Sequence, residues 1–359
     1  MILNLIKKAI KVELMNFFDS IKEQDGTPSR QAFSQAREKI SYSAFKDFFE
    51  KSCELAARSD GCRLYKGYRL LAVDGTSFIV GLMEKLEKYF GSSTTIPGKA
   101  MCRISGVVDV VNDCIVNASV SPFSTGERVL AIEQIKQLKG VSNALFLFDR
   151  GYWSPELISE IIGNGQKFLM RLASTNESAA MKSENGSLRH YSFTLPSGNK
   201  EFLVTNVSEE EMTDEELASL YAKRWGVETK YLELKSRLQI DVFSGESENI
   251  VLQDIYSTLY LSNLNAFICA GADEIIAEKT ADCNNKYEQR ANRSVCISAL
   301  RKRFIALCLL DSPIARGIAL ERLMKDISKS VSYVGKSKSR PRDERKIKSA
   351  HERRQRPVL

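Results

Sequence analysis

The sequence predicts an α/β fold in which helices flank a mixed β-sheet. Short apolar runs typical of buried strands alternate with helix signals between residues 66 and 173. Apolar residues recur instead at helical spacing before residue 60 and after about residue 250. Strands with intervening helices pack as a layered sheet, so this order predicts one central sheet with helical additions at both ends. A length of 359 residues allows two domains, or one domain with appendages.

Residues 1–60 are predicted to be helical throughout. Thr27 and Pro28 mark the start of a second helix, with Thr27 as its cap and Pro28 at the first helical position. On that helix Arg30 and Arg37 are seven residues apart and therefore share one face. A small bundle with a solvated basic face and a module that docks on DNA phosphates fit this pattern equally well.

The centre of the chain is predicted to form the sheet. Asn112-Asp113 is a hairpin signal between two apolar runs. A meander of three strands followed by alternating helices and strands describes a mixed sheet. The predicted elements, in order, are strands over Tyr68–Val73, Cys102–Val111 and Cys114–Val120, a helix from Ser124 to Leu138, a strand over Leu145–Phe148, a helix from Ser154, and a strand over Lys167–Leu172.

Residues 174–212 interrupt the alternation of helices and strands. They are polar, with β-like pieces at Tyr191–Leu195 and Phe202–Val207, and so predict a β-rich insertion. A capping-box pattern at Thr213–Glu216 then starts the helix that carries Glu228.

The predicted domains follow from these changes of pattern. Residues 1–62 form an N-terminal helical, candidate DNA-binding domain, and residues 63–330 form the central domain, which ends in helices over about 250–330. Residues 331–359 form a basic, disordered tail. The net charge of +7 lies in the last part of that tail, because residues 336–359 hold ten Lys or Arg and three Asp or Glu, and 10 − 3 = +7. Such a tail either binds phosphates without sequence preference or keeps the chain soluble.

Cysteine usage and hydropathy predict a cytoplasmic protein with no membrane partner. None of the eight cysteines forms a pair at metal-ligand spacing, so buried free thiols in a reducing compartment are expected. The apolar N-terminus is interrupted by Lys7, Lys8 and Lys11 and lacks the order of a signal peptide. No apolar stretch reaches the length of a membrane span.

Three carboxylates are the candidate catalytic residues. Asp74 and Asp149 each close an apolar strand-like run and are followed by turn residues, and Glu228 lies on a helix. Taken singly, an aspartate at a strand end is more often a turn residue than a catalytic one. Together, carboxylates at two strand ends and on a helix are what a divalent-metal site for phosphoryl transfer requires.

A polar stripe surrounds the glutamate. Tyr221, Arg224, Glu228 and Lys235 are spaced by three, four and seven residues, which places them on one helix face. A solvated face with an Arg224–Glu228 ion pair worth a few tenths of a kcal/mol would show the same spacing. A carboxylate between two cations and a phenol also suits a site where metal and phosphate meet.

This stripe resembles the Y-(2)-R-(3)-E-(6)-K signature of DDE transposases of bacterial insertion sequences. The Asp149–Tyr152 stretch resembles the second-aspartate motif of that group, and Val73–Thr76 resembles the first. The similarity covers about residues 66–240 and, less specifically, the helical N-terminus.

The resemblance implies a ribonuclease-H-like core with the β-rich insertion between its last strand and the glutamate helix. Asp74, Asp149 and Glu228 would be both the catalytic residues and the ligands of Mg2+, for which Mn2+ can substitute. DNA-binding residues are expected at the stripe, in the second motif and on the N-terminal helix, namely Tyr221, Arg224, Lys235, Arg150, Arg30 and Arg37.

The implied activity is cleavage at the ends of an insertion sequence followed by strand transfer. The partners would be double-stranded DNA, both terminal inverted repeats and target, with a homodimer holding paired ends on the bacterial nucleoid. A metal-dependent endonuclease without strand transfer, or a catalytically silent DNA-binding relative, remains an alternative. Residues 174–212 contain no Trp, so base stacking in a hairpin pathway would fall to Tyr191, Phe193 or Phe202.

Overall fold

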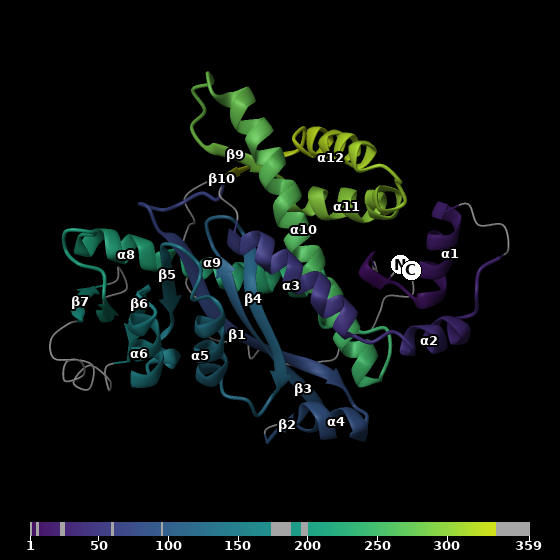
Figure 1. Cartoon of the computed structure of the whole chain (residues 1–359), viewed down its shortest axis with the longest axis horizontal. Coiled ribbons are helices and arrows are strands. Elements are labelled where there is room, and N and C mark those ends of the chain that lie inside the picture. The colour runs from purple at the N-terminus through teal and green to yellow at the C-terminus, as the bar shows by residue number, and fades with distance from the viewer. Residues whose placement is uncertain are drawn as a thin grey trace. The chain divides into compact units, whose positions relative to one another are not determined.

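The computed structural model describes residues 2–4, 7–21, 26–58, 61–94, 96–173, 188–194 and 200–334. The cationic segment 336–359 lies outside these residues, as does the part of the insertion between its two strands. Figure 1 labels the elements. No helix in the described ranges is both long enough and apolar enough to cross a membrane.

The chain divides into two compact units. We call Glu50–Phe78 with Leu82–Glu233 the sheet unit, and Met1–Phe49, Ile79–Gly81 and Leu234–Leu359 the helical unit. Each is described by itself below. The domain boundaries expected after residues 62 and 330 stay a prediction.

The sheet is mixed, as predicted. Its strand order is β2-β3-β1-β5-β6-β8-β7, with β4 paired to β3. The pairs β1–β5 and β5–β6 are parallel, whereas β3–β4, β6–β8 and β7–β8 are antiparallel. Flanked by helices, this sheet confirms the predicted α/β class with a central mixed sheet. The strands are β1 (Arg69–Gly81), β2 (Ser92–Ser93), β3 (Ile96–Asp109), β4 (Cys114–Pro122), β5 (Ala144–Phe148), β6 (Lys167–Leu172), β7 (Arg189–Thr194) and β8 (Lys200–Thr205).

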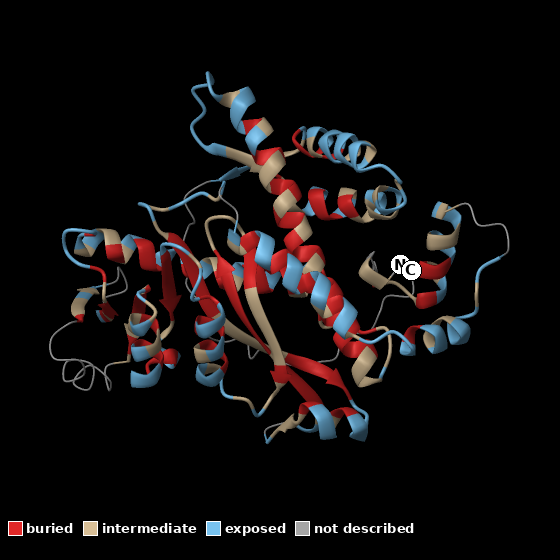
Figure 2. Ribbon diagram, in the orientation of Figure 1, coloured by how far each residue is buried: buried red, intermediate tan, exposed pale blue. Residues whose placement is uncertain are grey.

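The central strands are apolar on both faces because helices cover the sheet. Leu70–Val73 of β1 and Leu145–Phe148 of β5 are fully buried, so their runs show no alternation of polar and apolar residues. Figure 2 shows these strands as a buried layer beside helices whose outer faces are exposed. The helices of this region are α4 (Glu84–Phe90), α5 (Glu127–Gln137), η2 (Arg150–Tyr152), α6 (Pro155–Gly163), α8 (Asp214–Ala222) and α9 (Trp225–Ser236).

Local sequence signals place several boundaries. Ser154 caps α6 through the backbone N–H of Leu157, with Pro155 in the first turn. At the β3–β4 hairpin Asp113 has φ = +57°, the left-handed conformation that the Asn-Asp turn signal predicts. The predicted capping box of α8 is present, since Thr213 and Glu216 exchange both hydrogen bonds.

The two strands of the insertion extend the main sheet. β8 pairs antiparallel with β6, and β7 pairs with β8, so both strands continue the sheet beyond its last parallel strand. They begin at Arg189 and Lys200, two residues before the predicted starts.

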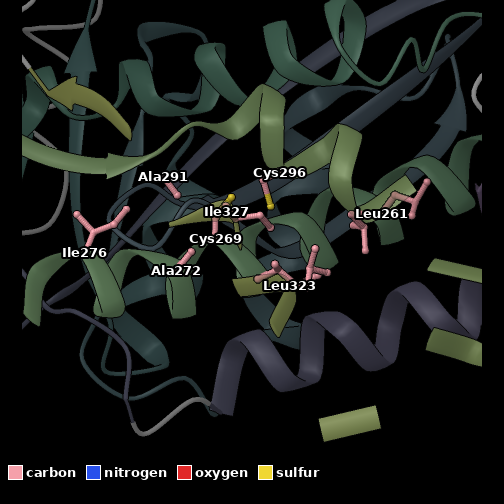
Figure 3. Packing of buried hydrophobic residues seen from close by; sticks show 10 residues of the cluster. Leu261, Cys269, Ala272, Ile276, Ala291, Cys296, Leu323 and Ile327 are labelled. Carbon is pink, nitrogen blue, oxygen red and sulfur yellow. The ribbon is translucent and has the colours of Figure 1, made fainter. Parts of the chain in front are cut away.

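The helical unit has its own hydrophobic core along α10. Cys269, Ala272 and Ile276 of α10 pack with Cys296 of α11 and Leu323 of α12, and all five are buried (Figure 3). The elements outside the main sheet region are η1 (Ile2–Asn4), α1 (Ile10–Ile21), α2 (Arg30–Glu38), α10 (Glu248–Thr280), β9 (Glu288–Ala291), α11 (Arg293–Cys308), α12 (Pro313–Ile327) and β10 (Val331–Val334). The residues of α3 (Ser43–Arg58) are divided between the helical unit and the sheet unit.

The α2 helix differs from the prediction in two ways. Its cap is Ser29, whose hydroxyl accepts from the N–H of Ala32, so the helix begins two residues after Pro28. Arg37 is only 2% exposed and forms an ion pair with Asp254 at 2.9 Å. The expected exposed basic face therefore contains Arg30 but not Arg37, because the guanidinium of Arg37 is used inside the helical unit.

Candidate active site

Asp74 and Asp149 lie at the same level on neighbouring parallel strands. In the β1–β5 register, Ala72 is opposite Leu147, and each aspartate is two residues beyond its member of that pair (74 − 72 = 149 − 147 = 2). Adjacent strands are about 4.8 Å apart. Asp149 directly follows β5 as predicted, but β1 continues to Gly81, so the turn expected after Asp74 is wrong and Asp74 lies within the strand.

Burial and surrounding charge set the state of Asp74. Burial is the largest influence and raises its pKa to about 6, against the lowering effects of the Gly75 N–H and the Arg224 guanidinium. Glu228 and Glu127 raise it further by their negative charge. The carboxyl is thus ionised above about pH 6 and protonated below it. A half-buried carboxylate beside two other acids is a place where an added cation is stabilised.

The predicted single glutamate helix is two helices. α8 ends at Ala222 and α9 begins at Trp225, with Lys223 and Arg224 in the turn between them. The backbone keeps winding through i→i−3 hydrogen bonds, from Arg224 N–H to the Tyr221 carbonyl and from Val227 N–H to the Arg224 carbonyl. Because the winding continues, the side chains of Tyr221, Arg224 and Glu228 still come together.

Arg224 is the cation with which the charged groups of the site interact. Its Nη2 donates to Oε1 of Glu228 at 2.9 Å, and its guanidinium lies 5.8 Å from the Tyr221 ring centre. Burial alone would lower its pKa, but the net direction is upward because Tyr221, Glu228 and Asp149 favour the cation. All three candidate carboxylates therefore interact electrostatically with one guanidinium, which itself is only 4% exposed.

Two polar atoms of this site lack a hydrogen-bond partner among the described residues. Nε of Arg224 and the hydroxyl of Tyr221 are buried and have no hydrogen-bond partner of good geometry in the described part of the chain. Such groups cost about 1–3 kcal/mol each when left unpaired. A ligand with acceptor oxygens, such as a phosphodiester, can supply the missing partner for the arginine.

The described residues contain no preformed cluster of three or more His, Cys, Asp or Glu side chains in position to hold a metal ion. Glu228 is instead bound to Arg224. The donor types nevertheless fit a hard divalent cation, because Asp74, Asp149 and Glu228 offer only carboxylate oxygens.

The other predicted DNA-binding residues have different positions. Arg150 is exposed at the start of η2, directly after Asp149. Lys235 is seven residues after Glu228 on α9, and Arg30 is exposed at the start of α2. Arg37 is buried in its ion pair and is not placed to meet DNA.

The two tryptophans also differ. Trp153 is 7% exposed and belongs to the buried core. Trp225 is 51% exposed, with the Arg224 guanidinium 5.3 Å from its ring centre.

Sequence reasoning missed two residues that support the site. The hydroxyl of Tyr231, a buried residue, donates to the backbone carbonyl of Asp74 at 2.6 Å and so ties α9 to β1. Glu127 lies against Gly75, where a Cβ would come within 2.8 Å of its Oε1. Tyr231 had a signal in its place one helical turn after Glu228, whereas Glu127 resembled an ordinary first-turn acid of a helix.

Gly226 allows α9 to approach the β3–β4 hairpin closely. A Cβ at this position would lie 2.9 Å from both Cβ and Cγ1 of Val110, a branched side chain that cannot swing away. The α9 backbone can therefore pack this close only with glycine, and this packing sets the position of Glu228 two residues later.

Gly226→Ala is expected to destabilise the protein by about 1–3 kcal/mol through overpacking. The change is measured as the shift in urea unfolding midpoint. Gly163→Ala is the matched control, because it is also helical and has nothing within 4 Å of the new methyl group. We expect the control to be neutral or up to about 1 kcal/mol more stable. Equal effects of the two substitutions would contradict a close approach at Gly226.

Comparison with known proteins assigns this arrangement to a family. The family model described as the transposase DDE domain matches residues 65–264, which is more than half of the chain and includes all three candidate carboxylates. The chain belongs to the DDE transposase domain family. It therefore carries an enzyme domain that acts on DNA. No curated protein matches this DDE transposase chain.

Among solved structures, this DDE transposase chain is similar to a piggyBac transposase studied as a synaptic complex with hairpin DNA. The TM-score is 0.43 at 13% sequence identity, over 73% of this chain and 57% of that chain. The chain thus spans just over half the length of that protein.

Proposed function

We propose that this DDE transposase binds the ends of a bacterial insertion sequence and catalyses metal-dependent DNA cleavage and strand transfer. One observation supports the proposal above all others. Asp74 and Asp149 occupy equivalent levels on adjacent parallel strands, and Arg224 links both electrostatically to Glu228. Three carboxylates with one buried guanidinium suit a reaction on an anionic phosphodiester.

In this proposal Asp74, Asp149 and Glu228 hold a divalent ion, Mg2+ in the cell and Mn2+ as a substitute. When bound, such an ion lowers the pKa of an attacking water or hydroxyl and offsets charge on the leaving oxygen. Glu228, which accepts a hydrogen bond from Arg224, would be the third ligand of such an ion. The Arg224 fork would then pair with a phosphate near the cut, which would give its Nε an acceptor.

The remaining proposed contacts hold the DNA. Arg150 and Lys235 neutralise backbone phosphates, and the Tyr221 hydroxyl donates to one. The substrates are duplex DNA with terminal inverted repeats and target DNA, joined by a homodimer that pairs two ends on the nucleoid of a bacterial cytoplasm.

A joining assay tests this function. Purified protein is incubated with a duplex that carries the inverted repeat flanking its gene, with a supercoiled plasmid as target, in the presence or absence of Mg2+. We expect cleavage at the repeat and covalent transfer of a pre-cut end into the plasmid. Cleavage without transfer would favour the endonuclease alternative, and binding without cleavage would favour the silent DNA-binding alternative.

Arg224→Ala is expected to reduce kcat/KM for end cleavage roughly 10- to 100-fold, the value of a lost charged hydrogen bond of about 1.5–3 kcal/mol. Arg224→Lys should recover only part of this, because an ammonium lacks the planar fork. Lys223→Ala is the control, since the Lys223 ammonium lies over the Tyr65 ring rather than near Glu228. Unchanged cleavage by Arg224→Ala in a folded protein would remove Arg224 from the proposed phosphate contact.

A further inference from the structure

The helical unit contains a second cationic feature, a pocket of about 420 Å3. Its walls come from three parts of the sequence, namely the bend before α1, the turn after α9, and one face of α11. We call it the α11 pocket. The lining residues are Lys8, Arg237, Ser294, Ile297, Ser298, Arg301 and Lys302.

The two faces of α11 have different roles. Cys296 and Leu300 are buried in the core with α10 and α12, and Figure 3 shows Cys296 directed into that cluster. Ser294, Ser298 and Lys302 repeat every four residues and are exposed on the pocket side. The core thus fixes the helix in position while a hydroxyl- and cation-bearing face stays accessible.

The lining of the α11 pocket is rich in cations. Four of its seven residues are Lys or Arg and none is Asp or Glu, and α11 itself contains four Lys or Arg and no Asp or Glu. Burial lowers the pKa of Arg301, and the negative charge of Glu13 partly opposes that effect. Like charges held together around a cavity repel one another, so an anion bound between them is favoured. Hydroxyl, ammonium and guanidinium donors together are the groups that bind phosphate oxygens.

We propose that the α11 pocket binds the phosphodiester backbone of duplex DNA. This inference rests on the proposed function in that DNA is the ligand, and it adds a contact that the sequence signature did not include. Lys302 and Arg237 provide the exposed charges, and Ser294 and Ser298 provide neutral donors to the same phosphates. Contacts with backbone phosphates contribute affinity and fix the position of the protein along the duplex. They do not discriminate between base sequences.

The test is the salt dependence of binding to a 30-bp duplex of arbitrary sequence. Binding is measured by fluorescence anisotropy. The pocket variant is Arg237→Gln with Lys302→Gln. The control is Arg303→Gln with Lys329→Gln, which removes the same charge from two exposed residues that both pair with Asp326. Each lost phosphate contact lowers the slope of log K against log salt by about 0.9. We therefore expect the slope to fall by about 1–2 for the pocket variant and to stay unchanged for the control.

Three outcomes would overturn the inference in distinguishable ways. Slopes equal to wild type in both variants would remove the pocket as a DNA site while leaving the proposed function intact. Equal losses in both variants would mean that the cations act as diffuse surface charge. A wild-type protein that binds no duplex would overturn the proposed function together with this inference. Circular dichroism melting of each variant confirms that the compared proteins are folded.

Discussion

Replacing Asp149 with asparagine is expected to lower Mg2+-dependent cleavage of repeat-bearing DNA by about 10²- to 10³-fold. The scale is that of removing one electrostatic group from a reacting phosphodiester site. Asparagine keeps the size of aspartate and can still accept from the Arg150 N–H, so the cap of η2 should survive. What is lost is the negative charge that a divalent ion and Arg224 both need. The measurement is single-turnover cleavage of labelled DNA.

Binding separates a chemical defect from a folding defect. We expect the Asp149→Asn protein to bind the same duplex within a few-fold of wild type and to unfold at the same urea concentration. Asp282→Asn, in the exposed turn after α10, is the control for a simple change of charge. Cleavage within tenfold of wild type by Asp149→Asn would exclude Asp149 from the metal-binding set.

Asp149 could be predicted from sequence because the residues that determine its position are its immediate neighbours along the chain. A fully apolar run of strand length precedes it. A strand that is buried between two parallel neighbours, as β5 is, ends where polar residues begin. Asp74 has a similar run before it, yet the Gly-Thr that follows is part of β1. Glycine inside a strand often marks a close approach of another group. Here Gly75 makes room for Glu127, a neighbour 52 residues away (127 − 75 = 52) that no local pattern identifies.

Spacing predicted which residues share a face but not what covers that face. The Tyr221, Arg224 and Glu228 stripe was recognisable because helical winding continues through the turn between α8 and α9. The same reasoning placed Arg37 beside Arg30, and it failed because the partner of Arg37 is Asp254, 217 residues further on. Long-range ion pairs depend on tertiary packing, which a single sequence does not encode in its periodicity.

Asp109 shows how a buried carboxylate differs from the three candidate site residues. It is 0% exposed and accepts four hydrogen bonds, so both of its oxygens are fully used. The donors are Nε of Arg69 at 2.7 Å, the backbone N–H groups of Val111 and Asn112, and the Asn112 amide. Arg69 in turn binds the carbonyls of Ala56 and Ala57 at the end of α3. This carboxylate therefore connects a hairpin turn, β1 and a helix end.

Asp109→Ala is expected to destabilise the protein by about 3–5 kcal/mol, because it leaves the buried Arg69 cation unpaired. The measurement is the free energy of unfolding in urea, with Asp282→Ala as the exposed control. A loss below about 1 kcal/mol would show that water or another group compensates Arg69.

The double replacement Arg69→Met with Asp109→Leu separates two contributions to the stability lost in Asp109→Ala. One is the uncompensated Arg69 cation, and the other is the lost hydrogen bonds of the hairpin turn. Removing both charges abolishes the uncompensated cation, and apolar pairs of similar volume are often as stable as a buried ion pair. The N–H groups of Val111 and Asn112 would still lose their acceptor, each at a cost of about 1–3 kcal/mol where water cannot reach them. We therefore expect partial recovery relative to Asp109→Ala. Full recovery would show that the carboxylate serves only Arg69, and no recovery would show that its main role is to hold the hairpin turn.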